Sequence, residues 1–223
     1  VQGIKMSKLF TGTLWDQSDI QPLVPNTNVN FFHEEQERPM AEHAIARGLT
    51  DYKCDDIRYV SNSAGFRCDE FELNEHPIIV FAGCSFTFGH ALPAQDVWAY
   101  RVISKLRQEV NPHLKYFNIA RQGAGLDTIV RALLAFKSFA IPHVVVGLLP
   151  ERSRTELYLE NNYVIETFYG GDNDRSSNNY MGVNYAAKDT LMAYEENMIG
   201  DPFFDAYRMA KNLAMIDLYQ QST

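Results

Sequence analysis

Apolar and polar residues alternate irregularly in the first third of the chain, and thereafter the apolar residues gather into short, separated runs. The runs at 78–82, 115–120 and 144–149 are rich in β-branched and aromatic residues, which predicts strands. Between them, apolar positions recur at helical spacing over 97–106 and 128–139. This order predicts an α/β fold with a parallel sheet. The unbroken apolar run at 144–149 further predicts a strand buried on both faces.

The segments around these runs predict the domain organisation. Prolines and an asparagine-rich stretch oppose regular structure in residues 1–45, and the whole of 1–75 is expected to form an arm packed on a core domain at 76–223. Polar and aromatic residues at about 158–185 predict a lid loop. Two helices are expected to follow, and because a doubly wound sheet normally continues with another strand, the domain is expected to be truncated after Thr223.

The second of these helices has clear start signals. Asp201 is its predicted N-cap and Pro202 its predicted first residue. Apolar residues at helical spacing are expected to pack this helix on the core, namely Phe203, Tyr207, Ala210, Ala214 and Leu218.

Composition narrows the classes of function. The chain has 223 residues, 46% of them hydrophobic, which suffices for one core. A net charge of −8 argues against a nucleic-acid or anionic-membrane binder. Neither a membrane span nor a signal peptide is evident, and Cys54, Cys68 and Cys84 predict no disulfide framework. These features favour a cytoplasmic or virion-associated protein. No ligand cluster suggests a metal or a cofactor.

The candidate chemistry lies in the turn that follows the run at 78–82. Here Gly83-Cys84-Ser85-Phe86-Thr87-Phe88-Gly89 places a hydroxyl at the carboxyl edge of the predicted sheet, where open α/β folds bind ligands. His90 follows Gly89, so the Gly-Lys-Ser/Thr ending of a phosphate loop is missing, which disfavours a nucleotide-binding domain. Thr87 stands where the Gly-x-Ser-x-Gly elbow has its second glycine. A serine that only caps a helix is the structural alternative.

This turn resembles the first motif of the SGNH/GDSL hydrolase family, in which the serine is the nucleophile. Cys84 stands where that family usually has Asp. A second turn, from Asn118 to Gly123, resembles the family's second motif, whose glycine N–H binds the oxyanion. The resemblance implies a three-layer α/β/α, flavodoxin-like domain, with catalytic roles for Ser85 and Gly123. Further candidate substrate-binding residues at the same edge are Cys84, Thr87, Asn118 and Arg152.

The third and last motifs of the family are degenerate or missing. Leu149 occupies the place of an Asn that donates to the oxyanion, and the loss of such a donor costs about 3–4 kcal/mol of transition-state stabilisation. Arg152 or Arg154 is a candidate to replace this missing donor. Alternatively, both arginines are ordinary surface charges. The chain contains no Asp-x-x-His, which supplies the general base in the family.

The histidines of this chain do not replace the missing base in an obvious way. His76, His113 and His143 precede the predicted strands, at the opposite edge of the sheet, and His33 and His43 belong to the arm. His90 is close to Ser85 in sequence but is better explained as an exposed polar residue. A segment from Tyr59 to Arg67 also resembles one found before the first motif in longer SGNH proteins, and we expect Arg67 to form a structural ion pair.

Two functions from different classes follow. The first is a serine esterase, deacetylase or O-acyl transferase acting on acyl esters, with acylated polysaccharide as one candidate substrate. Aromatic residues of the predicted lid are candidates for stacking on sugar rings, although aromatic residues in a loop more often anchor it onto the domain. The second is an inactive SGNH-like scaffold with a binding or structural role, for example in a virion or a surface assembly, for which a homo-oligomer or an assembly partner is expected.

Overall fold

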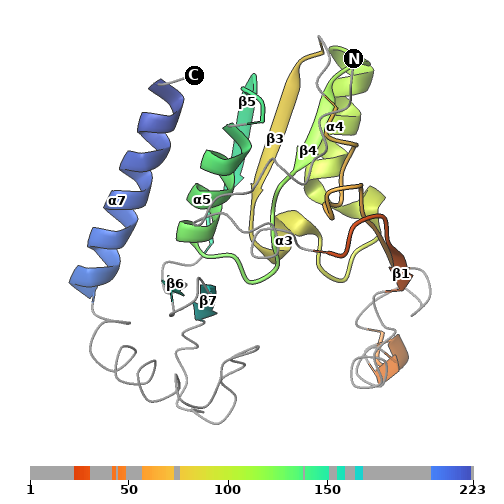
Figure 1. Ribbon diagram of the computed structural model, residues 1–223. Coiled ribbons are helices and arrows are strands. Elements are labelled where there is room, and N and C mark those ends of the chain that lie inside the picture. Colours follow the sequence, from red (N-terminus) through yellow and green to blue (C-terminus); the bar gives the residue numbers. More distant parts are fainter. Residues whose placement is uncertain are drawn as a thin grey trace.

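The computed structural model describes residues 23–30, 42–43, 45–48, 57–72, 76–137, 139–150, 155–158, 164–167 and 202–221. Its centre is a parallel sheet of three strands in the order β4-β3-β5, formed by Lys115–Asn118, Ile78–Gly83 and Val144–Leu148. β3 pairs with β4 from Ile78↔Lys115 and with β5 up to Gly83↔Leu148. The strand-helix-strand order and the parallel pairing confirm the predicted α/β class (Figure 1).

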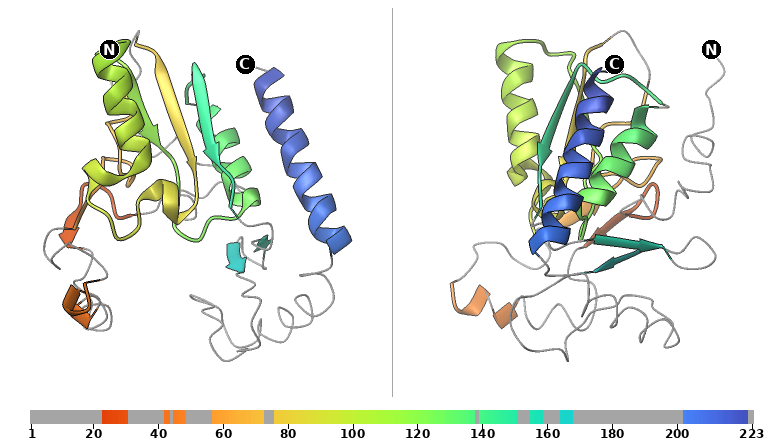
Figure 2. Two further views of the ribbon diagram at one scale, coloured as in Figure 1. Left: turned by 180° about the vertical axis from the view of Figure 1, so that it is seen from behind. Right: turned by 90° about the vertical axis from the view of Figure 1, so that its left-hand side faces the viewer.

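Helices cover both faces of this sheet. Successive residues of β3 point to opposite faces, and because apolar side chains lie on both, each face packs against a helix. Helix α5, Leu126–Lys137, packs against Val80 and Ala82 on one face. Helix α4, Trp98–Glu109, packs against Ile79 and Phe81 on the other. Figure 2 shows the sheet edge-on between the two helices. All six residues of β3 are buried, so this strand is the centre of the core.

The third predicted strand forms as expected, but its predicted burial is wrong. Val144 and Leu148 of β5 are 48% and 42% exposed. β5 pairs with β3, and no other described strand lies along its second edge. A strand with one paired edge has fewer neighbours to cover its faces than a central strand such as β3. The apolar run at 144–149 therefore identified a strand of the sheet without revealing that it lies at the edge of the described strands.

The predicted lid contains regular structure at its start. Strands β6, Thr155–Tyr158, and β7, Val164–Thr167, form an antiparallel pair. The expectation of a loop is thus wrong over 164–167, where the β-branched residues Val164, Ile165 and Thr167 favour a strand. The remainder of the predicted lid lies outside the described residues.

The last helix, α7, spans Pro202–Gln221 and begins at the predicted proline. Its predicted packing face is wrong. Tyr207 and Leu218 are 63% and 57% exposed, whereas Arg208 and Asn212 are buried. α7 packs beside α5 through these polar residues, both of which bond to the Asp127 carboxylate (Figure 1). The position of that carboxylate, rather than the apolar pattern, determines which face of α7 is turned inward.

Two described parts of the arm, residues 23–30 and 57–72, lie on the core. Strands β1, Asn28–Asn30, and β2, Arg58–Val60, form an antiparallel pair. Beyond β2, Phe66 and Phe71 join the cluster formed by β3, β4 and α5. Among the described helices, none combines the length and the apolar character needed to cross a bilayer.

Candidate functional site

The turn after β3 forms a single helical turn, α3, Ser85–Phe88. Cys84 is its N-cap in extended conformation, and Gly89 ends it with a φ of 82°. Ser85 is therefore the first helical residue and is partly exposed, and its neighbour Phe86 is 70% exposed. Because β3 is parallel to both of its neighbours, this turn lies at the carboxyl edge of the sheet, as the sequence predicted.

Gly123 lies in the corresponding turn of the neighbouring strand. Beyond the end of β4, Arg121 N donates to the carbonyl oxygen of Gly83 at 3.2 Å, which joins the two turns at their bases. Gly123 itself has a φ of 80°, a conformation that favours glycine. The structure thus brings the turns of Ser85 and Gly123 together at one edge, from strands that are adjacent in the sheet.

The polar groups expected to perform the chemistry are not engaged in holding the fold. Within the described part of the chain, no hydrogen bond is made by Ser85 Oγ or by the backbone N–H groups of Ser85 and Gly123. The Ser85 carbonyl is engaged, since it accepts from Gly89 N and His90 N at 2.9 Å each. A hydroxyl and two N–H groups near the surface are therefore available to a ligand.

Two of the candidate substrate-binding residues, Cys84 and Thr87, are buried. Cys84 is 2% exposed, belongs to the apolar core and makes no side-chain capping bond. Thr87 is 0% exposed, and its Oγ1 has no hydrogen-bond partner among the described residues. It packs on Gly83, where an added Cβ would lie 2.2 Å from Thr87 Oγ1. Their contacts support the turn, and their role toward a substrate stays a prediction.

Asn118, the last residue of β4, connects its strand to α3. Its Nδ2 donates to the Thr87 carbonyl at 2.7 Å and to the Tyr116 hydroxyl at 3.1 Å, and its Oδ1 accepts from Ala120 N. Both polar atoms of its side chain are thereby occupied, and the residue is 2% exposed. The contacts give Asn118 a structural role in holding α3 against β4.

The third strand contributes no side-chain donor at the described part of this edge. Leu149 follows the end of β5 and is 42% exposed. Arg152 and Arg154 lie outside the described residues, so neither replacement is tested. Among the histidines, His143 lies at the amino end of the sheet, where its Nδ1 accepts from Ile78 N at 3.1 Å, and His76 stacks on His113. The exposed His90 directly follows the turn of α3.

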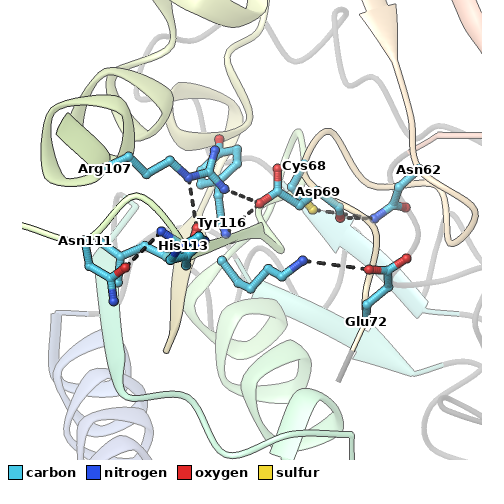
Figure 3. Close-up of polar contacts among 10 residues, drawn as sticks. Asn62, Cys68, Asp69, Glu72, Arg107, Asn111, His113 and Tyr116 are labelled. Carbon is cyan, nitrogen blue, oxygen red and sulfur yellow. Dashed lines mark hydrogen bonds and ion pairs between the residues drawn. The ribbon is translucent and has the colours of Figure 1, made fainter. Parts of the chain in front are cut away.

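The sequence did not foretell how the arm joins the sheet. Asp69 accepts hydrogen bonds from Arg107 on α4 and from the backbone N of Tyr116, and Asp69 N donates to the Tyr116 carbonyl (Figure 3). Asn62 Nδ2 donates to the Asp69 carbonyl at 2.9 Å. No sequence pattern around Asp69 predicts such partners, because they come from residues 38 and 47 positions away.

The sequence predicted an ion pair for Arg67. This prediction is wrong, because no ion pair of Arg67 is found among the described residues. The guanidinium instead donates to the backbone carbonyls of Phe88, Gly89 and Leu92. Since these carbonyls belong to the last residue of α3 and to the four residues after it, the arm contacts the segment that carries Ser85.

Tyr116 makes stability sensitive to alkaline pH. Burial raises the pKa of its hydroxyl from the usual 10.0, while the hydrogen bond from Asn118 acts in the opposite sense. Above pH 10 the unfolded chain therefore loses a proton that the folded chain keeps, so stability falls as pH rises. We expect urea unfolding from pH 8 to 12 to show a decline that is shallower in Tyr116→Phe, by about 1.4 kcal/mol per pH unit above pH 10. Equal slopes in the two proteins would contradict this assignment.

Comparisons with known proteins do not assign a family. Neither a scan against models of protein families nor a search of curated proteins finds a match. Within the described ranges, no three His, Cys, Asp or Glu side chains gather as a metal site requires. The function must therefore be argued from the site itself.

Proposed function

We propose that this chain has an SGNH-like, flavodoxin-like three-layer domain and transfers acyl groups through Ser85, as a serine esterase, deacetylase or O-acyl transferase. The observation that carries the proposal is the set of unengaged groups at one sheet edge: Ser85 Oγ and the N–H groups of Ser85 and Gly123. Such a set fits a nucleophile with an oxyanion hole. The order β4-β3-β5, with a helix on each face, supports the proposed domain type.

In the proposed reaction, Ser85 Oγ forms a bond to the acyl carbon of an ester. The carbonyl oxygen becomes an oxyanion, which accepts hydrogen bonds from the two N–H groups. Collapse breaks the bond to the alcohol, which leaves with the proton that Ser85 has lost. Water or a second alcohol then forms a bond to the acyl carbon, the bond from this carbon to Ser85 Oγ breaks, and the proton of the attacking hydroxyl returns to Ser85 Oγ. The side chain of Leu149 provides no third donor to the oxyanion.

The proposal predicts that Ser85 reacts with a fluorophosphonate probe and with p-nitrophenyl acetate. Ser85→Ala is expected to lower the release of p-nitrophenol roughly 100-fold or more and to abolish labelling of the peptide that contains residue 85. Ser104→Ala is the matched control, because Ser104 lies on α4 away from the turn and should leave both signals unchanged. Equal rates for Ser85→Ala and the wild type would contradict the proposal.

A second candidate is an inactive scaffold with a binding or structural role. The exposed apolar side chain of Leu149, at the place of an oxyanion donor, favours it. This alternative predicts no labelling of Ser85 by the probe in a protein that is folded. The labelling experiment therefore separates the two candidates.

A further inference from the structure

Helix α3 cannot hold Ser85 in place by its own hydrogen bonds. It has four residues, and a single helical turn is unstable in isolation. Its last carbonyls also lack partners within the helix, as at the end of any helix. The geometry of Ser85 therefore depends on contacts from outside the helix, which are made by Asn118 at the Thr87 carbonyl and by the residues that bind the segment 88–92.

Arg67 of the arm binds this segment from inside the protein. Its Nη1 donates to the carbonyl of Gly89 at 2.8 Å and to that of Phe88 at 3.4 Å, and its Nη2 donates to that of Leu92 at 3.0 Å. The residue is 7% exposed. One planar guanidinium thus satisfies three carbonyls that fold around it, which the single ammonium point of a lysine cannot reproduce.

Tyr59 completes the contact from the same arm. The Arg67 guanidinium carbon lies 4.4 Å from the centroid of the Tyr59 ring and 5.5 Å from that of Phe88. The Tyr59 hydroxyl accepts from Ala91 N at 2.9 Å. Cation–π contact and carbonyl oxygens together stabilise the buried charge. We call Tyr59 and Arg67 the arm clamp.

The clamp is linked to Ser85 through one residue. Gly89 accepts from Arg67 through its carbonyl and donates to the Ser85 carbonyl through its N–H, at 2.9 Å. His90 N donates to the same carbonyl. Movement of the Gly89 backbone would therefore move Ser85. A misplacement of about 1 Å in a reacting group can reduce a rate about 100-fold.

We propose that Arg67 is a positioning residue for Ser85, so that the arm is a working part of the site and not only a cover for the core. The proposal rests on the proposed function of Ser85. It assigns Arg67 no contact with substrate, and it predicts that the arm clamp controls the reactivity of Ser85 through the carbonyls at 88, 89 and 92.

The test compares Arg67→Lys with Arg58→Lys. Arg58 is the matched control because it lies in the same arm and is exposed, with side-chain bonds to Asn28 and Asn30. Hydrogen exchange of the amides at 86–92 measures the clamp without any reference to activity. The rate of Ser85 labelling by a fluorophosphonate measures positioning. For Arg67→Lys we expect exchange at 86–92 at least tenfold faster and labelling about 10- to 100-fold slower, with neither change in Arg58→Lys.

Each outcome decides one question. Unchanged exchange in Arg67→Lys overturns the clamp, whether or not Ser85 reacts. Faster exchange with unchanged labelling overturns the positioning role. Absence of labelling in the wild type refutes the proposed function, while exchange still tests the clamp. Should Arg67→Lys not fold, Tyr59→Phe keeps the ring and removes the hydroxyl that accepts from Ala91 N. It is expected to show the same two changes at smaller size, and their absence overturns the proposal.

Discussion

Replacing Gly83 with alanine is expected to lower the free energy of unfolding by roughly 3 kcal/mol. The added Cβ would lie 2.2 Å from Thr87 Oγ1, 2.8 Å from Thr87 Cβ and 3.0 Å from the Leu148 carbonyl. Thr87 is fully buried, and Leu148 O is a backbone atom of the paired strand, so neither can move away freely. Space, and not backbone conformation, therefore requires glycine here. Urea unfolding monitored by tryptophan fluorescence and circular dichroism measures the change.

Gly147→Ala is the matched control for this substitution. Gly147 pairs with Ala82 on the neighbouring strand, and a Cβ there meets only Leu149 Cδ2, at 3.9 Å. We expect a change of about 1 kcal/mol or less. Adding Thr87→Ala to Gly83→Ala removes the closest clash and should restore part of the stability, which a double-mutant cycle detects. Equal losses for Gly83→Ala and Gly147→Ala would show that the contact with Thr87 is not the cause.

Replacing Asp127 with alanine is expected to destabilise the protein by about 3 kcal/mol. Its carboxylate lies in the first turn of α5 and contacts Arg208 at 3.3 Å, Asn212 at 2.7 Å and Lys211 at 3.6 Å on α7. Arg208 and Asn212 are buried, so removal of the carboxylate leaves polar groups in the interface without the anion that faces them. The loss of an acidic group near a helix N-terminus adds to the effect.

Hydrogen exchange should show where this stability is lost. Because α7 packs beside α5 through Asp127, the amides of α7 are expected to exchange faster than those of β3 in Asp127→Ala. Glu109→Ala is the control, since Glu109 forms an exposed pair with Lys105 at 3.8 Å that contributes about 0.5 kcal/mol or less. A urea midpoint for Asp127→Ala that equals that of Glu109→Ala would contradict the assignment.

Helix α7 illustrates why part of the fold could not be predicted. The sequence signals for its start were sufficient, because capping and the fixed φ of Pro202 act within a few residues. The face of α7 that packs inward is not determined by neighbouring residues in the sequence. An apolar stripe with Tyr207 and Leu218 indicated one side, and a carboxylate about 80 residues earlier in the chain selected the other.

The candidate site divides in the same way. The turns of Ser85 and Gly123 could be placed at one edge because strand order and parallel pairing place every strand's carboxyl end together. The partners of Arg67 could not be predicted in this way. An ion pair was expected, whereas the guanidinium binds a set of backbone carbonyls. Carbonyl groups occur at every residue, so no sequence pattern marks the three that a distant guanidinium will bind.

The sequence alone determined the α/β class, the strands β3, β4 and β5, the helices between them and the position of Ser85 at a sheet edge. These follow from periodicity, turn residues and helix signals, which act over short distances along the chain. Only the tertiary structure decided the exposure of β5, the inward face of α7, the close packing of Thr87 on Gly83 and the contact of the arm with the turn of Ser85. Each of these depends on atoms brought together from distant residues, where burial and hydrogen bonding select one arrangement among many that the local pattern allows.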